Sequence, residues 1–305
     1  MAELGRHITQ FSSQRLLSEV MMTFLFRTKL KAVFKALRLE ESKDTVISSI
    51  PITCIQHFPH PNAMAALTPR GDPFILVDSK FSACFHAMVK LVLQRARPKQ
   101  QKGDTGSVKS LRVSDTDLAT YLKQLGAYVF SDQQEPLPII PMPDTEEVQV
   151  WSSMLVHGLE TFIVCHELSH HLLGHEGFAV EARGKMTELD GKVLARFQNE
   201  ELEADTLGAQ LSYAVFDFYR DKNKAAEAEV PPTFAREIFA APDIFCTFLD
   251  VWETSWGMGW PADTHPPGGV RREKIRKVFS NTLPPEVVEF AKGMQAICES
   301  IASIA

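Results

Sequence analysis

The sequence has few of the features that mark secreted or membrane proteins. Its five cysteines are odd in number and widely spaced along 305 residues, at Cys54, Cys84, Cys165, Cys246 and Cys298. This pattern excludes a disulfide framework and a CxxC metal knuckle, and it favours reduced thiols in a cytosol. No run reaches the roughly 18 uncharged apolar residues of a membrane span, and the first residues, MAELGRHITQFSSQ, lack the parts of a secretory signal. We therefore expect a cytoplasmic protein with no membrane partner.

The chain also lacks a large excess of charge of either sign. Lys and Arg number 32 and Asp and Glu 38, which gives a formal net charge of −6. This mildly acidic balance argues against a general nucleic-acid binder. Hydrophobic residues make up 45% and charged residues 23%, so a disordered, collagen-like or fibrous chain is excluded. The length fits one large domain or two modest ones, and no internal repeat is present.

Apolar periodicity indicates that most of the chain is helical. Residues 11–40 form an amphipathic pattern among basic residues, for which a helix packed on the core is favoured over a membrane-surface helix. Residues 45–78 contain β-branched runs broken by Pro, Asn and Gly, which is typical of a small sheet. Further helices are expected at 80–96, 115–125, 193–220 and 233–257, and as a pair within 268–303.

Two segments are expected to connect these elements. Residues 97–117 are polar and contain glycine, as in a mobile surface loop. Residues 135–143, EPLPIIPMP, hold four prolines in nine residues, which predicts an extended connector. A long helix should then begin at Asp144, which forms a capping pair with Glu147, and end at Gly174 or Gly177.

The long helix contains His166-Glu167-Leu168-Ser169-His170, an HExxH motif. Residues four apart lie on the same face of a helix, so the two imidazoles can bind one Zn²⁺ together. Glu167 then lies beside them and can take a proton from a metal-bound water. The spacing and the residue types therefore match a hydrolytic mechanism.

The alternative interpretation of this motif is a solvent-facing helix rich in histidine. It is supported by His171 and His175, which form a second pair four apart. The motif histidines, however, share one stripe with apolar residues, and inward histidines without a partner would be costly. The apolar members of the stripe are Leu159, Phe162, Ile163 and Leu173. A bound metal would remove the cost of burying these histidines. His171 and His175 fall toward another face of the helix, where we expect them to be merely exposed to solvent.

A catalytic zinc site needs a third protein ligand and an open position for water. The metzincin pattern HExxHxxGxxH is disfavoured, because positions 173 and 176 hold Leu173 and Glu176. Downstream, Glu201 and Asp205 lie four apart in a strongly helical stretch. If Glu201 reaches the metal, Asp205 on the same face can hold the remaining N–H of a ligating histidine.

The alternative for this acidic cluster is an exposed helix face, the usual place for a run of charge. Two features oppose it. Ala204 and Gly208 are small where this helix would press against the HExxH helix. The helix also has an apolar side, made by Leu207, Leu211, Val215 and Phe218. Glu200 or Glu203 can substitute as ligand in principle, but neither is followed by a carboxylate four residues later.

Four motifs between residues 61 and 271 carry a family resemblance. HELSH followed by ELEAD resembles the gluzincin metallopeptidases, whose pattern is HExxH plus ExxxD, and the EAD ending resembles the M48 group. THPP at 264–267 followed by Arg271 resembles the stretch after the third ligand in that group, except that Arg272 replaces an apolar residue. PNAMA at 61–65, before the strand FILVD, resembles its edge strand. With no membrane span, the chain is most similar to the soluble Lit-type phage-exclusion peptidases.

The resemblance implies an α+β fold, with a mostly helical zincin-like metallopeptidase domain and a small N-terminal mixed β-sheet. It implies a single domain over residues 1–305. The parts in chain order are an N-terminal helix (1–44), a small sheet and helix (45–96), a loop and linker (97–143), the HExxH and ExxxD helices (144–220) and a C-terminal helical part with the THPP segment (221–305).

The resemblance also implies a role for each matching residue. Zn²⁺ would be held by His166, His170 and Glu201. Glu167 would act as general base and then as proton donor to the leaving amine, and Asp205 would orient a ligating histidine. His265 would stabilise the oxyanion, unless it merely starts a Pro-led helix. A substrate strand would pair with an edge formed by Asn62, Ala63, Met64 and Ala65, unless this is an ordinary sheet edge.

The resulting expectation is a zinc-dependent endopeptidase that hydrolyses a peptide bond in an intracellular protein. Resemblance to the Lit-type enzymes implies a single host protein as substrate, such as an elongation factor, and a phage-derived or stress trigger. One alternative is a regulator-cleaving protease of the ImmA/IrrE kind, which HELSHHLLGHE also resembles. Another is a non-catalytic zinc or interaction protein, which the intact Glu167 disfavours because a structural site has no use for a base.

Overall fold

The computed structural model describes residues 22–38, 50–55, 63–78, 80–96, 113–130, 136–141, 146–175, 191–225, 232–256 and 265–304. Several expectations lie outside these residues. They are the first part of the helix over 11–40, the cap at Asp144, the stop at Gly177, most of the loop over 97–117, Asn62 and Thr264.

The described chain is mostly helical and carries one small sheet near its N-terminal end, as the sequence predicts. The strands are β1 (Ile52–Ile55), β2 (Ala63–Leu67) and β3 (Pro73–Asp78). After a helix over residues 22–36, the helices are α2 (Lys80–Ala96), α3 (Asp115–Phe130), α4 (Glu146–Leu173), α6 (Gly191–Ala225), α7 (Pro232–Phe239), α8 (Ala241–Trp256), α9 (Gly268–Phe279) and α10 (Pro285–Ala302).

The sheet is mixed and has the strand order β1-β3-β2. β1 pairs with β3 in parallel, whereas β2 pairs with β3 antiparallel across a turn in which Gly71 adopts a positive φ of 86°. The helix over residues 22–36 lies along the outer side of β1, because Thr23 Oγ1 accepts a bond from the Cys54 amide and Arg27 donates to the Ile52 carbonyl. The other edge of the sheet is β2.

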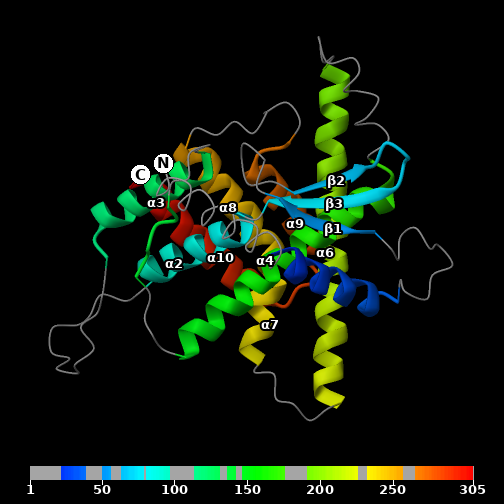
Figure 1. The fold of residues 1–305 in the computed structure, drawn as a ribbon. Coiled ribbons are helices and arrows are strands. Elements are labelled where there is room, and N and C mark those ends of the chain that lie inside the picture. Colours follow the sequence, from blue (N-terminus) through cyan, green and yellow to red (C-terminus); the bar gives the residue numbers. More distant parts are fainter. Residues whose placement is uncertain are drawn as a thin grey trace, which may run out of the picture.

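Helix α4 is the centre of the molecule and packs against α2, α6, α7, α8 and the sheet. Figure 1 shows the strands on one side of α4, beside the long α6, and α2, α3, α8 and α10 gathered on the other side. By length and composition α4 is apolar enough to cross a membrane, although the sequence shows no long uncharged run. However, 61% of its most apolar stretch is buried inside the protein, as in a core helix. Leu173, the last residue of the stripe that was expected to face inward, is instead 43% exposed.

Two of the differences between the expected and the observed helices have a clear physical cause. The single helix expected over 233–257 is two helices, α7 and α8, separated at Ala240. Pro242 accounts for the break, since proline lacks an N–H and its ring clashes with the carbonyl four residues earlier. Helix α3, expected to end near 125, continues to Phe130 because Leu122, Leu125 and Val129 extend one buried face.

Candidate metal centre

Helices α4 and α6 bring the candidate ligands together because they approach each other closely. A Cβ built on Gly208 would lie 2.9 Å from the His166 Cα, a separation that real side chains do not reach. Ala204, one turn earlier, is fully buried at the same interface. The small residues that the sequence singled out are therefore at the helix contact, and they place the acidic turn of α6 opposite the HExxH turn of α4.

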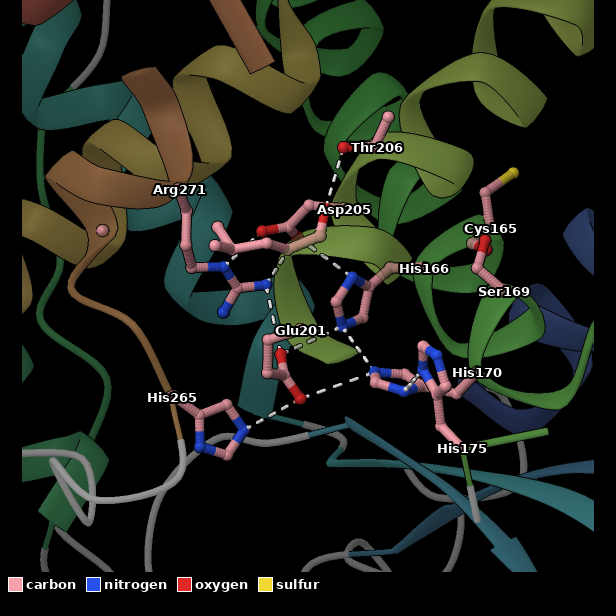
Figure 2. A network of polar contacts seen from close by, with 12 residues as sticks. Cys165, His166, Ser169, His170, His175, Glu201, Asp205, Thr206, His265 and Arg271 are labelled. Atoms are coloured by element: carbon pink, nitrogen blue, oxygen red, sulfur yellow. Dashed lines mark hydrogen bonds and ion pairs between the residues drawn. The ribbon is translucent and has the colours of Figure 1, made fainter. Parts of the chain in front are cut away.

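Three groups that can bind a metal converge at this contact, from the side chains of His166, His170 and Glu201 (Figure 2). The two Nε2 atoms lie 3.2 Å apart, and each lies 3.5 Å from an oxygen of Glu201. Two ligands that bind Zn²⁺ at about 2.0–2.2 Å with tetrahedral angles would lie roughly 3.3–3.5 Å from each other. The three groups thus have the spacing of ligands around one small cation, as the sequence predicts.

The electrostatics of the cluster also favour a cation. Burial opposes a positive charge on His166, but the carboxylates of Asp205 and Glu201 outweigh it and raise the pKa of its imidazole to about 10. Burial likewise opposes ionisation of Glu201, yet the surrounding histidines hold its pKa well below its usual value. Two imidazole nitrogens facing each other at 3.2 Å repel unless a proton or a metal lies between them. The residues therefore fit a divalent metal.

Asp205 lies where the sequence predicts, behind His166. Its Oδ1 is 3.1 Å from His166 Nδ1, within hydrogen-bond range, although the ring is not oriented for a straight N–H···O bond. The same carboxylate accepts two bonds from Arg271, at 2.7 and 2.6 Å, and all three side chains are buried. Burial opposes the charge of Asp205, and Arg271 outweighs it and lowers the pKa of the carboxyl. Arg271 therefore fixes the carboxylate that orients His166.

His265 reaches the same cluster from the segment before α9. Its Nε2 lies 3.5 Å from Glu201 Oε1, and its side chain is 28% exposed, more than those of the three candidate ligands. The Gly268 amide donates to the carboxylate of Glu253, which fixes the start of α9 beside this residue. Burial lowers the pKa of His265. The imidazole is thus placed at the open side of the cluster.

Glu167 is buried at the start of the same helical turn as the candidate ligands. It adjoins His166 in the chain, and its negative charge acts on the ring of His265 and opposes the lowering of its pKa. A carboxylate in this position can exchange a proton with a water molecule held at the cluster. The placement agrees with the role that the HExxH motif predicts.

The strand β2, which the sequence predicts as a sheet edge, lies next to α4. Ala63, Met64 and Ala65 are partly buried and pair with β3, while Asn62 lies outside the described residues. His171 Nε2 contacts the Phe74 carbonyl at 3.0 Å and so ties α4 to β3. The sheet is therefore held beside the HExxH turn.

The sequence missed His175, and the expectation that His171 and His175 are merely exposed is wrong. His175 is only 8% exposed, and its Nδ1 lies 3.1 Å from His170 Nδ1. The physical reason is Gly174, whose positive φ of 70° ends the helix. The His175 amide then donates back to the His170 carbonyl at 3.0 Å, which folds the chain over the last turn. The glycine was a visible signal, but the four-residue spacing assumed that the helix continued.

Comparisons of this chain with protein-family models, with curated proteins and with solved structures find no match. The functional interpretation therefore depends on the geometry of the site and on the motifs that build it.

Proposed function

We propose that the protein is a zinc-dependent endopeptidase of the gluzincin type, with an M48-like zincin fold. One observation carries the proposal. The Nε2 atoms of His166 and His170 and the carboxylate of Glu201 converge within 4.8 Å of one another from two different helices. Glu167, whose position in the motif is that of a general base, is buried beside them.

His166, His170 and Glu201 would hold the metal, and bound Zn²⁺ would lower the pKa of a water molecule and polarise the scissile carbonyl. Glu167 takes the proton from the attacking water and delivers it to the leaving amine. His265, at the open side of the cluster, donates a hydrogen bond to the developing oxyanion. Asp205, whose Oδ1 lies 3.1 Å from Nδ1 of His166, would orient this ring and is itself fixed by Arg271.

The substrate class follows from the sheet beside the site. β2 lies next to α4, and its sequence resembles the edge strand along which the M48-like group binds an extended polypeptide through main-chain hydrogen bonds. We infer that a protein segment in extended conformation is the substrate, cleaved where it passes the candidate ligands. A cytoplasmic location belongs to the proposal and is supported by five cysteines that are all free and buried.

The test compares cells that express the wild-type protein with cells that express Glu167→Gln. Proteome-wide detection of new protein N-termini should reveal one cleaved host protein in the wild-type sample, reduced at least about 100-fold in the variant. Metal analysis of both purified proteins should give one zinc per chain. Glu273→Gln, at an exposed glutamate of α9, is the matched control and should cleave like the wild type.

The identity of the cleaved protein also separates the peptidase interpretations. A single housekeeping protein as target supports a Lit-like role, and a DNA-binding repressor supports a regulator-cleaving protease. A third outcome would contradict the proposed enzymatic activity. The wild type and Glu167→Gln would bind zinc equally, neither would cleave a protein, and a hydroxamate would not compete for the metal. This result would support a non-catalytic zinc protein.

A further inference from the structure

A chain of three side chains leads from the protein surface to one of the candidate ligands. Glu203 is 64% exposed, and its Oε2 lies 3.3 Å from His175 Nε2. His175 Nδ1 in turn lies 3.1 Å from His170 Nδ1, and His170 Nε2 faces the metal centre. Figure 2 shows the ring of His175 next to that of His170, on the side away from Glu201. None of the motifs in the sequence assigns a role to His175.

The proton positions along this chain are fixed by elementary chemistry. An imidazole that binds a metal through Nε2 is neutral and carries its proton on Nδ1. His170 must then donate from Nδ1, so His175 must accept at its own Nδ1. A neutral His175 therefore carries its proton on Nε2, where Glu203 accepts it. One arrangement of protons satisfies all three contacts, and it is the arrangement that leaves the His170 Nε2 lone pair free for a metal.

The backbone at the end of α4 fixes the position of His175. The His175 amide bonds to the His170 carbonyl, and Gly174 supplies the positive φ that this return requires. The two rings are 5.1 Å apart between centroids and are inclined at 70°. The position of the acceptor is thus determined by the helix end itself.

The two candidate histidine ligands consequently have different partners. His166 faces Asp205, a fully buried carboxylate that is locked by Arg271. His170 faces a neutral imidazole whose far side reaches an exposed glutamate. Outer partners of this kind orient the ligand ring and select its tautomer, and their loss weakens metal binding by roughly 10–100-fold.

We propose that His175 is a positioning residue, which accepts the Nδ1 proton of His170 and so holds Nε2 of that ligand ready for zinc. This inference rests on the proposed zinc site and extends it. By this inference, the turn around Gly174 contributes to metal affinity in addition to ending the helix. Glu203 contributes less, because water can replace an exposed acceptor.

The experiment measures zinc affinity by competition with a chromophoric chelator in the purified full-length chain. His175→Leu should bind zinc roughly 10–100-fold more weakly than the wild type. His175→Asn should stay within about threefold, because its side-chain oxygen can take the place of the Nδ1 acceptor. His171→Asn, which removes the neighbouring histidine that contacts β3, is the matched control and should keep wild-type affinity.

A second readout is the nitrogen-15 NMR of the zinc-loaded protein labelled in its histidines. It should show His170 protonated at Nδ1 and His175 protonated at Nε2. This readout decides the question if His175→Leu does not fold. Wild-type affinity in a folded His175→Leu would overturn the inference, as would equal losses in the Leu and Asn variants, because these would indicate packing alone.

The outcomes also separate this inference from the function proposed above. If the wild-type protein binds no zinc, both fail. If it binds zinc and cleaves its substrate in a Glu167-dependent way, while His175→Leu binds zinc normally, the inference about His175 fails by itself.

Discussion

Helix α4 contributes side chains to two polar clusters, and the clusters differ in how their charges are balanced. The first, which we call the Lys29 cluster, consists of Lys29, Ser82, His157 and Glu160. Glu160 accepts bonds from Lys29 at 2.9 Å and from Ser82 at 2.5 Å, and the same ammonium lies 2.7 Å from His157 Nδ1. Each acceptor faces a donor from the protein, so the cluster is complete without a ligand.

The candidate metal centre lies farther along the same helix, and its charges are balanced differently. His166, His170 and Glu201 direct acceptor atoms at one another. Among the described side chains that contact it, Arg271 supplies the fixed positive charge, and Arg271 is already bonded to Asp205. The comparison teaches that burial and charge alone do not mark a functional site. Acceptors that converge with few protein donors do, because they must share a proton or bind a cation, and here only the Arg271 guanidinium, 3.6 Å from Glu201 Oε2, adds a fixed charge among the described residues.

The largest expected effect is on metal binding at Glu201. Glu201→Gln removes the charge of one candidate ligand and should weaken zinc binding by more than the roughly 10–100-fold cost of losing an outer partner. Glu200→Gln is the matched control, since Glu200 pairs with Arg196 and acts on His175 through its charge alone. Zinc content and chelator competition measure both variants. If the Glu200 variant lost zinc and the Glu201 variant kept it, the assignment of Glu201 as the ligand would be wrong.

The Lys29 cluster should respond in stability and not in metal binding. Lys29→Met leaves the buried carboxylate of Glu160 without its cation and should lower the free energy of unfolding by about 3–5 kcal/mol. The double variant Lys29→Met/Glu160→Gln should recover much of this loss, because the uncompensated charge is gone. Urea unfolding of the zinc-free proteins measures the change. Simple additivity of the two substitutions would show that the pair is not coupled.

The contact between α4 and α6 should be sensitive to a single methyl group. In Gly208→Ala the new Cβ would lie 2.9 Å from the His166 Cα, which is too close for two carbon atoms. Overpacking of this kind costs about 1–3 kcal/mol of unfolding free energy. It should also weaken zinc binding, because it separates the helices that carry the ligands. Gly293→Ala in α10, where a Cβ meets nothing within 4 Å, is the control and should be neutral or slightly stabilising. Equal effects at both positions would refute the close approach.

The smallest expected effect is a pH dependence from the Lys29 cluster. Desolvation and then the Lys29 ammonium lower the pKa of His157 from 6.5 to about 4, although part of the ring is exposed. Between these values the unfolded chain binds the proton and the folded chain does not. Stability from this group is therefore present above pH 6.5 and falls as the pH drops toward 4. Without zinc, the unfolding free energy of the wild type should fall more steeply from pH 7 to pH 4 than that of His157→Gln, because the variant lacks the titrating imidazole.

The sequence predicted the parts of the site that depend on local geometry. The HExxH spacing places two histidines on one face of any helix, and the pairing of small residues with an acidic turn in α6 indicated which helix comes close. Both follow from periodicity within a single element. The structure brings together all the candidate ligands, Asp205 and His265.

Other features depend on contacts that no local pattern encodes. Lys29 and His157 are 128 residues apart, and nothing in the sequence near either residue indicates that they meet. The break before α8 depends on one proline within a strong helical pattern, and the return of His175 depends on the φ of Gly174. In each case a single backbone constraint or a distant partner overrode the periodicity.

X-ray absorption at the zinc edge of the metal-loaded protein tests the central claim most directly. We expect one zinc per chain, with two imidazole nitrogens at about 2.0–2.1 Å, carboxylate oxygen at about 2.0–2.2 Å and room for one water. The imidazole signal should weaken in a His166→Ala variant. A shell of six oxygens, a sulfur ligand, or a spectrum unchanged by His166→Ala would contradict the claim that these three side chains hold the metal.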